Sequence, residues 1–347
     1  MPRYKHFLYI HSLRFDISRS CIRICEINLL DTFTRCEKYS SKLNFFEFRP
    51  RSVEKNVFFF YILSLKLDIS RSFIRIFTAQ KTKTLKTTYM KKFILDLKVR
   101  ETVPVGKQAV LLRLTADEQL PEMLPGQFVE VRVDQTPSVM LRRPISIHYY
   151  DKALNELGLL VQLVGDGTRW MATLKAGDTV NIVLPLGNGF TLPADKAVRP
   201  LLVGGGVGVA PLLYLGMKLR EMGIEPTFLL GSRTENELMQ IAEFEKVGRV
   251  FITTENGAVG EQGYVTQHSL LEKEQFDQVY TCGPKPMMVA VARWAKGAGV
   301  ACEVSLENKM ACGVGACLCC VEDTKEGHVC VCSEGPVFSI DKLSWQI

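Results

Sequence analysis

The sequence of 347 residues predicts a multidomain α/β plus β protein, in which an antiparallel β-barrel precedes a parallel-sheet domain and a small C-terminal cysteine-rich domain. Three observations predict this order. Short strands separated by turn residues follow one another through 91–187, a glycine-rich turn joins a buried strand to a helix within 199–223, and six cysteines crowd into 312–332. We expect the three domains to span 90–193, 194–298 and 299–347.

The first 89 residues differ from the rest in charge and composition. They contain 17 Lys and Arg, 7 Asp and Glu and no Gly, and the segment 12–24 recurs as 64–76. Two copies are too few for a solenoid, and Met90, followed by two lysines and an alternating apolar strand, is typical of a chain start. We predict that 1–89 is a non-functional or disordered extension from a mis-called start. A basic appendage that binds a partner is the alternative.

Composition excludes several function classes. The basic extension accounts for the net charge of +6, and the rest of the chain is slightly acidic, so we expect no nucleic-acid binding. The longest apolar run, 57–65, is far shorter than the ~18 to 20 residues of a membrane span. We therefore expect a cytoplasmic protein with no membrane association, in which clustered cysteines bind metal or carry out redox chemistry rather than form disulfides.

Two motifs in the predicted barrel indicate a flavin site. The predicted strands are 91–99, 108–116, 126–134, 142–151, 157–165 and 178–187. In "RRPISI", Arg143 can bind a pyrophosphate with its forked guanidinium, and Ser146 can hydrogen-bond the ribityl chain or the ring edge. Some 20 residues later, Gly167 and Thr168 of "VGDGTRWM" open a short helix whose N–H groups face the phosphates. Alone, R-P-x-S is a weak signal; the second motif strengthens it.

The glycine-rich turn indicates a nicotinamide dinucleotide site. Its four glycines allow the backbone to approach a pyrophosphate closely: Gly204, Gly205, Gly206 and Gly208. Pro211 suits the first turn of the helix that follows. No acidic residue about 20 positions later is placed to bind the ribose 2′-hydroxyl, and Arg233 would favour a 2′-phosphate. The choice between NAD and NADP is therefore open.

Cys282 is the candidate catalytic residue. It lies in "TCGPKPMM", where a predicted strand ends and a helix begins, and parallel sheets present ligands at that edge. We expect it to lie near the nicotinamide and the flavin. An inert buried thiol is the alternative.

Four cysteines have the spacing of a plant-type [2Fe–2S] loop, C-x4-C-x2-C followed by a distant fourth cysteine: Cys312, Cys317, Cys320 and Cys332. A two-iron cluster needs four thiolates in one small volume, and Gly313 and Gly315 let the backbone wrap closely. A zinc site is the alternative. Cys319 and Cys330 are left over, and we expect them to be spectators, although each lies close enough to replace a ligand.

This order of motifs resembles the ferredoxin–NADP⁺ reductase superfamily and, more closely, the electron transfer subunits of class 1B dihydroorotate dehydrogenase. The resemblance covers about 90–347 and is carried by "LRRPISI", "GDGT", "GGGVGVAPL", "TCGPKPMM" and "LENKMACGVGACLCCVED…CSEGPVF". It implies that FAD is held by Arg143, Pro144, Ile145, Ser146, Leu160, Val161, Gln162, Gly167 and Thr168. It further implies that the four cysteines hold the [2Fe–2S] cluster and that NAD docks on the glycine turn and Cys282.

The resemblance also implies a partner and an electron route. A separate catalytic subunit with FMN would oxidise dihydroorotate, in an assembly of two plus two subunits. Electrons would pass through the cluster and FAD to NAD⁺, and we expect the partner to dock on 335–345 beside the cysteine loop. One alternative is a subunit of an NADPH-dependent ferredoxin or sulfide oxidoreductase, and a more distant one is a zinc-stabilised, non-enzymatic binding module.

Overall fold

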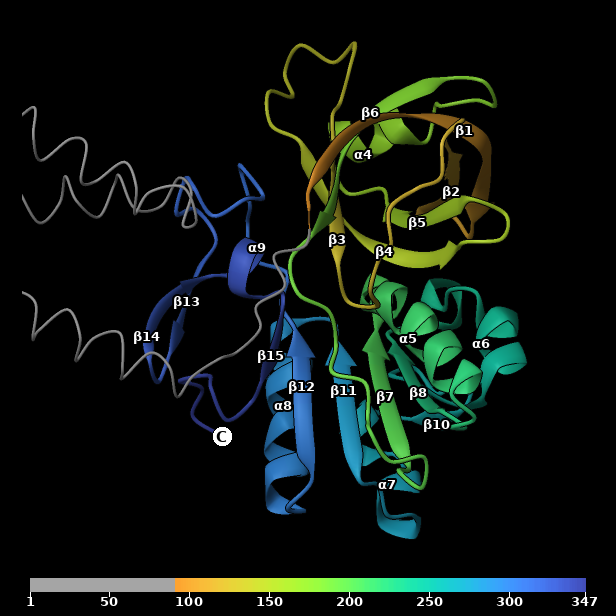
Figure 1. Cartoon of the computed structure of the whole chain (residues 1–347). Coiled ribbons are helices and arrows are strands. Elements are labelled where there is room, and N and C mark those ends of the chain that lie inside the picture. Colours follow the sequence, from red (N-terminus) through yellow and green to blue (C-terminus); the bar gives the residue numbers. More distant parts are fainter. Residues whose placement is uncertain (1–90) are drawn as a thin grey trace, which may run out of the picture. The chain divides into compact units, whose positions relative to one another are not determined.

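A computed structural model of the chain describes residues 91–347 (Figure 1). The predicted extension at 1–89 lies outside the described residues. The described part contains a barrel, a seven-stranded sheet with its helices, and a short hairpin. No helix in it is long and apolar enough to span a bilayer.

The predicted antiparallel barrel is confirmed. Six strands close it in the order β1-β2-β5-β4-β3-β6, and every neighbouring pair is antiparallel. The strands are β1 (Phe93–Val105), β2 (Ala109–Thr115), β3 (Phe128–Val131), β4 (Arg143–Asp151), β5 (Glu156–Gln162) and β6 (Thr179–Leu186). Alternate side chains such as Leu97, Leu112 and Leu159 point inward and form a single buried cluster. The short helix α4 (Asp166–Met171) follows β5.

The predicted parallel sheet is also confirmed. Its order is β10-β9-β8-β7-β11-β12-β15, and only β15 runs antiparallel to its neighbour. Its strands are β7 (Pro200–Gly205), β8 (Thr227–Ser232), β9 (Arg249–Thr254), β10 (Glu261–Gln262), β11 (Gln278–Cys282), β12 (Ala301–Ser305) and β15 (Val337–Ser339). Strand β7 lies between β8 and β11, so the glycine turn that follows it leaves the middle of the sheet.

The helical segments connect the strands of the sheet. They are η1 (Gly206–Val209), α5 (Ala210–Glu221), η2 (Glu235–Glu237), α6 (Ile241–Val247), η3 (Val265–Gln267), α7 (Leu270–Lys273) and α8 (Lys285–Gly297). Pro211 occupies the first turn of α5, as predicted, where its missing N–H costs no hydrogen bond.

The cysteine-rich segment consists of an irregular loop and a small hairpin. After β12 the chain forms a loop, then β13 (Val321–Thr324), β14 (Gly327–Cys330) and the single turn α9 (Val331–Glu334). It then returns to the large sheet as β15. The predicted division at residue 298 therefore places β12 and β15, which are part of the large sheet, with the cysteine domain.

The barrel and the sheet domain lie next to each other (Figure 1), and a cluster of buried residues joins them. Leu160 of β5 and Ala109 of β2 belong to the same buried cluster as the α5 residues. His148 of β4 is wholly buried, and its Nδ1 donates to the carbonyl oxygen of Ala210, 2.7 Å away. The hydroxyl of Tyr214 on α5 donates to the carbonyl oxygen of Met123 at 2.8 Å. These contacts tie the barrel wall to the start of α5.

Candidate redox-cofactor sites

The two segments predicted to hold a flavin meet at one end of the barrel. A Cβ atom placed on Gly167 would lie 3.0 Å from Nε of Arg143 and 3.2 Å from its Cγ. The absence of a side chain at Gly167 therefore lets the Arg143 side chain lie against the loop before α4. A guanidinium and a loop backbone that are this close can bind the same pyrophosphate from two sides.

The two adjacent arginines have different surroundings. Arg142 donates to the carbonyl oxygens of Glu130 and Asn181 and to Oδ1 of Asn181, so it ties β4 to β3 and β6. Arg143 donates only to carbonyl oxygens of its own loop, those of Leu141 and Arg142. Within the described residues no carboxylate pairs with Arg143, so its charge is available to an anion.

The pairing between β4 and β5 stops before it reaches Arg143, at the start of β4. It ends where Ile147 pairs with Leu159, and the residues of β4 before Ile147 pair with β3 alone. Beyond Leu159, strand β5 is paired only with β2. The Leu160 side chain packs toward the sheet domain, the Val161 side chain packs inside the barrel, and Gln162 lines a cavity. Leu160 and Val161 can therefore meet a flavin only through their backbone.

The remaining predicted flavin residues have two roles: some are placed to contact a flavin, and others hold the loop before α4 in place. Pro144, Ile145 and Ser146 are half-buried along the first part of β4. The Thr168 hydroxyl accepts hydrogen bonds from two N–H groups of its own loop, both at 3.1 Å, and donates to the carbonyl oxygen of Gly165. Thr168 therefore fixes the loop, and its backbone rather than its hydroxyl is free for a phosphate.

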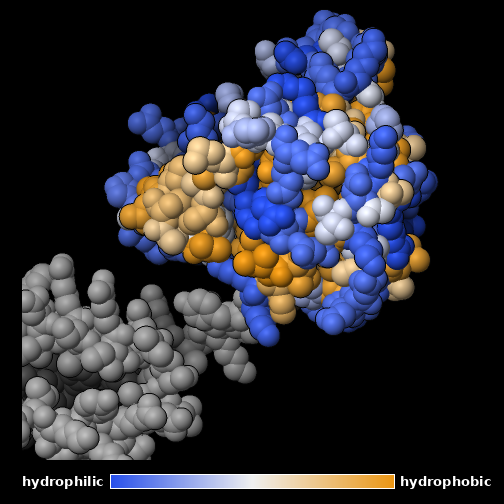
Figure 2. Space-filling model, turned by 90° about the horizontal axis from the view of Figure 1, so that it is seen from above, coloured by the Kyte–Doolittle hydropathy of each residue, from blue (hydrophilic) through white to orange (hydrophobic). Residues whose placement is uncertain are grey.

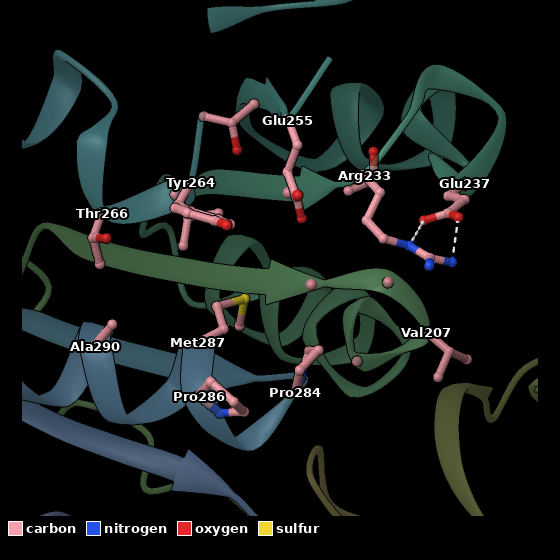
Figure 3. Close-up of a pocket in the computed structure, with 18 of the residues that line it drawn as sticks. Val207, Arg233, Glu237, Glu255, Tyr264, Thr266, Pro284, Pro286, Met287 and Ala290 are labelled. Carbon is pink, nitrogen blue, oxygen red and sulfur yellow. Dashed lines mark hydrogen bonds and ion pairs between the residues drawn. The ribbon is translucent and has the colours of Figure 1, made fainter. Parts of the chain in front are cut away.

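A cavity of about 700 Å³ lies over the carboxyl ends of the parallel strands (Figure 3). Its lining comes from the glycine turn, the ends of β8 and β9, the 263–266 segment and the start of α8. Pro284, Pro286 and Met287 of the last of these lie opposite Glu255 and Tyr264 (Figure 3). This is the edge at which parallel sheets bind nucleotides.

Three of the four predicted glycines line this cavity, and each has a reason to lack a side chain. Gly206 has a φ of +57° and faces open space, so it can bring backbone to a ligand. A Cβ on Gly208 would lie 2.6 Å from the carbonyl oxygen of Cys282, and one on Gly205 would lie 2.5 Å from Sδ of Met287. Gly204 lies below the lining and packs against α5 and the residue before it.

Cys282 lies beneath the cavity rather than on its surface. Its side chain is wholly buried, and the neighbouring Gly283 lines the cavity instead. Burial raises the pKa of the Cys282 thiol, and the Glu307 carboxylate raises it further. The thiol donates to Oε1 of Glu307 at 3.9 Å, and Glu307 does line the cavity. A catalytic role for Cys282 stays a prediction, and the structure adds Glu307 as its polar partner.

Pairs of sulfur atoms lie near each other in the cysteine loop. The sulfur of Cys312 interacts with that of Cys317, the sulfur of Cys332 interacts with that of Cys320, and the charge of Cys312 acts on Cys332. Backbone N–H groups point at three of these sulfurs: Gly315 donates to Cys332 at 3.0 Å, Cys332 to Cys320 at 3.4 Å, and Val314 to Cys312 at 3.5 Å. Such donors stabilise thiolates and the sulfur atoms of a bound cluster.

The pKa values of Cys312 and Cys332 show which thiolate the loop stabilises. Burial raises the pKa of Cys312, but the N–H groups of Val314, Ala316 and Cys317 outweigh it and lower this pKa to about 6. Burial and the neighbouring Cys320 raise the pKa of Cys332 to about 12. The loop thus stabilises the Cys312 thiolate by itself, whereas the Cys332 thiolate needs a cation to balance its charge. Four cysteine thiols are the donor type that a [2Fe–2S] cluster takes.

The two remaining cysteines of the loop differ from each other. Cys319 is exposed, whereas Cys330 is 8% exposed and its side chain interacts with that of Cys320. Of the two, Cys330 is the better placed to replace a ligand. The four-cysteine ligand set stays a prediction.

Glu130 is a site residue that the sequence analysis did not identify. Val129 and Val131 face the barrel core, so Glu130 on the same strand faces outward, where it is wholly covered. A Cβ on Gly313 would lie 2.6 Å from Cγ of Glu130, so the cysteine loop covers this carboxyl. Neither carboxyl oxygen has a hydrogen-bond partner among the described residues. Burial raises its pKa to about 7, despite the opposing effect of Arg142.

Comparisons with known proteins agree with this geometry. Residues 202–293 match the family model of the oxidoreductase NAD-binding domain, and residues 307–344 match that of the iron–sulfur cluster binding domain of dihydroorotate dehydrogenase B. The dihydroorotate dehydrogenase B (NAD(+)) electron transfer subunit of Fusobacterium nucleatum subsp. nucleatum is 37% identical, over 70% of this chain and 95% of that protein. That of Listeria innocua serovar 6a is 38% identical, over 72% and 98%.

This chain belongs to the family of dihydroorotate dehydrogenase B electron transfer subunits. The chain is also similar to the solved structure of an NADH-dependent reduced ferredoxin-NADP oxidoreductase, with a TM-score of 0.65 and 29% identity over 72% of this chain and 90% of that one. A ferredoxin reductase of a carbazole 1,9a-dioxygenase shares the fold, with a TM-score of 0.53 and 21% identity over 61% and 68%.

Replacing Arg143 by Gln should weaken FAD binding about 10- to 100-fold, because a charge-assisted hydrogen bond contributes about 1.5–3 kcal/mol. The measurement is the FAD dissociation constant from flavin fluorescence. Arg113→Gln, which removes a partly exposed arginine paired with Glu101 on the barrel, is the matched control and should bind FAD normally. Equal affinity in both variants would contradict the assignment of Arg143.

Replacing Cys332 by Ser should remove the visible absorption and the electron paramagnetic resonance signal of the reduced cluster. Cys319→Ser should leave both signals intact, because its thiol is exposed and outside the ligand spacing. Cys330→Ser tests the substitution of ligands: loss of the cluster in that variant, with retention in Cys332→Ser, would show that Cys330 is the fourth ligand.

Glu130 should make stability depend on pH. Its pKa in the folded protein, about 7, exceeds its usual value of 4.5. The contribution of neutral Glu130 to the free energy of unfolding is therefore complete below pH 4.5 and is lost as the pH rises through 7. Glu130→Gln cannot ionise and should be more stable than wild type at pH 8, by up to about 3 kcal/mol.

The measurement is the thermal midpoint of the cofactor-loaded protein between pH 5 and pH 8. The exposed Glu118→Gln is the control for removing a charge from the barrel. A difference between Glu130→Gln and wild type that does not change with pH would contradict the burial of an uncompensated carboxylate.

Proposed function

We propose that this chain is the electron transfer subunit of an NAD-dependent dihydroorotate dehydrogenase, and that it serves the de novo synthesis of pyrimidine nucleotides. The observation that carries the proposal is the cysteine loop. It matches the iron–sulfur domain model of this family, it brings two pairs of cysteine sulfurs together, and it follows a barrel and a nucleotide sheet of the reductase type. The cofactors are FAD and a [2Fe–2S] cluster, and the electron acceptor is NAD⁺.

The geometry supports different roles for the flavin, cluster and nicotinamide sites. FAD exchanges single electrons with an iron–sulfur cluster and a hydride with a nicotinamide, so it belongs between the two. Arg143 and the backbone at Gly167 bind and orient the flavin phosphates, and the open end of the β4–β5 ladder offers backbone to the rest of the flavin. The glycine turn binds the dinucleotide in the adjoining cavity, whose lining includes Gln162 of β5.

The subunit would function as the NAD-linked diaphorase half of a larger assembly. Its partner would be a separate catalytic subunit that carries FMN and oxidises dihydroorotate, and two copies of each would form a heterotetramer. The assembly would work in the cytoplasm. The names of the relatives, which describe an electron transfer subunit, support the existence of such a partner.

The cysteine loop is the best-supported docking surface for that partner. Val314, Leu318 and Val321 are 42%, 66% and 38% exposed, and Cys317 between them is an exposed cluster ligand candidate. Figure 2 shows hydrophobic side chains gathered on the side of the described part that carries this loop in Figure 1. A partner that covers these side chains would bring its own redox group close to the cluster.

Phe338, the residue at the centre of the expected docking edge 335–345, is not accessible to a partner. Phe338 of β15 is 6% exposed and belongs to the core cluster of the sheet, because β15 pairs with β12. The Phe338 side chain therefore packs into the core, although β15 is the outermost strand of the sheet and Asp341, Lys342 and Ser344 after it are exposed.

A second candidate function is a subunit of an NADPH-dependent ferredoxin or sulfide oxidoreductase. The similarity to the solved NADH-dependent reduced ferredoxin-NADP oxidoreductase supports this second candidate. The identity of the protein that co-purifies with the native chain separates the two candidates.

Adding NADH to the protein purified without air should bleach both the flavin bands and the broad cluster absorption. Both changes are expected because the nicotinamide, flavin and cluster sites would form one electron path. The measurement is a visible spectrum before and after the addition. A spectrum without flavin or cluster bands, together with stoichiometric zinc, would contradict the redox function.

Replacing Leu318 by Asp should weaken the complex with the catalytic subunit at least about tenfold, because it places a charge in an apolar contact. Co-elution and the dissociation constant measure the effect, and the flavin and cluster spectra show that the subunit is otherwise intact. Leu154→Asp changes another exposed leucine, in the β4–β5 turn, and should have no effect. Unchanged co-elution of Leu318→Asp would exclude this surface.

A further inference from the structure

One end of the cavity carries a group of charged side chains that the electron path does not use. Arg233 follows β8, Glu237 ends the η2 turn, and Glu255 follows β9, and all three line the cavity (Figure 3). Glu255 is brought to this place because its N–H donates to the carbonyl oxygen of Ser232 at 3.1 Å. Arg233 is the only Lys or Arg among the lining residues within the described chain.

The charge of Arg233 is already engaged by Glu237. Its Nε donates to Oε2 of Glu237 at 3.1 Å, and its Nη2 donates to Oε1 at 2.6 Å (Figure 3). This two-pronged geometry is the strong form of an arginine–carboxylate pair. The acid is the better anchored member, since the Glu237 side chain is 22% exposed and that of Arg233 is 72% exposed. Glu255 lies close enough for its charge to act on Arg233 as well.

The place of these side chains identifies the part of the dinucleotide that they meet. In nucleotide sheets of this type, the pyrophosphate lies on the glycine turn after the first strand, and the adenosine ribose lies at the end of the second strand. Here these positions are Gly205–Gly208 and the end of β8. The sequence has no acid at the usual position, but the fold brings Glu255 from the next strand and Glu237 from the following turn.

We propose that Glu237 and Glu255 select the unphosphorylated adenosine ribose, so that this chain accepts NAD and rejects NADP. This inference rests on the proposed nicotinamide role of the cavity. Carboxylates accept hydrogen bonds from ribose hydroxyls, whereas a 2′-phosphate would meet two negative charges. Arg233, which would otherwise bind that phosphate, is neutralised by Glu237. The names of the relatives give NAD(+) as their nucleotide, and the acidic pair supplies a physical cause for that choice in this chain.

The test compares two small nucleotides that differ only in the 2′-phosphate, 5′-AMP and adenosine 2′,5′-bisphosphate. Their dissociation constants are measured by calorimetry on the FAD-loaded protein, so that no electron transfer is involved. Wild type should prefer 5′-AMP at least about tenfold. The double variant Glu237→Gln, Glu255→Gln should lose that preference or reverse it, because Arg233 becomes free. Adding Arg233→Gln to the double variant should then weaken binding of the bisphosphate again.

Glu235→Gln is the matched control. It removes the same charge two residues from Glu237, where the carboxylate accepts from Asn256 and does not line the cavity, so it should leave the preference unchanged. A double variant that keeps the wild-type preference, with normal FAD content, would overturn the acidic pair as the selector but not the nicotinamide role. Failure of both nucleotides to bind any form of the protein at millimolar concentration would overturn both.

Discussion

The arrangement of the redox sites depends on how the barrel wall packs against the start of helix α5. His148 is wholly buried in this interface, with Nδ1 on the carbonyl oxygen of Ala210 and Nε2 2.6 Å from the side-chain amide of Gln240. Burial lowers the pKa of His148, against the opposing effect of these two hydrogen bonds, and so favours the neutral ring between the domains. The strand that carries His148 begins with Arg143. Fixing this strand therefore also fixes the flavin site relative to the glycine turn.

The cysteine loop depends on a second close approach, between its backbone and the outer face of the barrel. Gly313 has a φ of +66°, and its missing side chain leaves room for Glu130. This contact places the candidate cluster beside the strand that pairs with the first part of β4, which is the flavin segment. Glu130 is therefore a buried acid between the cysteine loop and the predicted flavin segment. Its carboxyl has no hydrogen-bond partner in the described chain, so its charge state responds directly to its surroundings.

Sequence patterns predicted well where the signal is local. The six barrel strands, the strand–turn–helix unit around the glycines and the sulfur-rich loop each follow from residues close together in the chain, through strand alternation, turn residues or ligand spacing. The same patterns predicted less well which side chains reach a ligand. Gly204 and the Thr168 hydroxyl have structural roles, and the Cys282 thiol lies beneath the cavity surface, because the direction of a side chain depends on what packs against it.

The sequence alone determined the order of the domains, the chemistry of the cysteine loop and the family, because spacing and composition are properties of the chain itself. Only the tertiary structure decided which distant residues share a site. Glu255 comes to Arg233 through the pairing of β9 with β8, Glu307 comes to Cys282 through β12 beside β11, and Gly313 comes to Glu130 across more than 180 residues. Strand pairing creates these neighbours, and pairing between distant strands is set by packing of the whole fold rather than by local sequence.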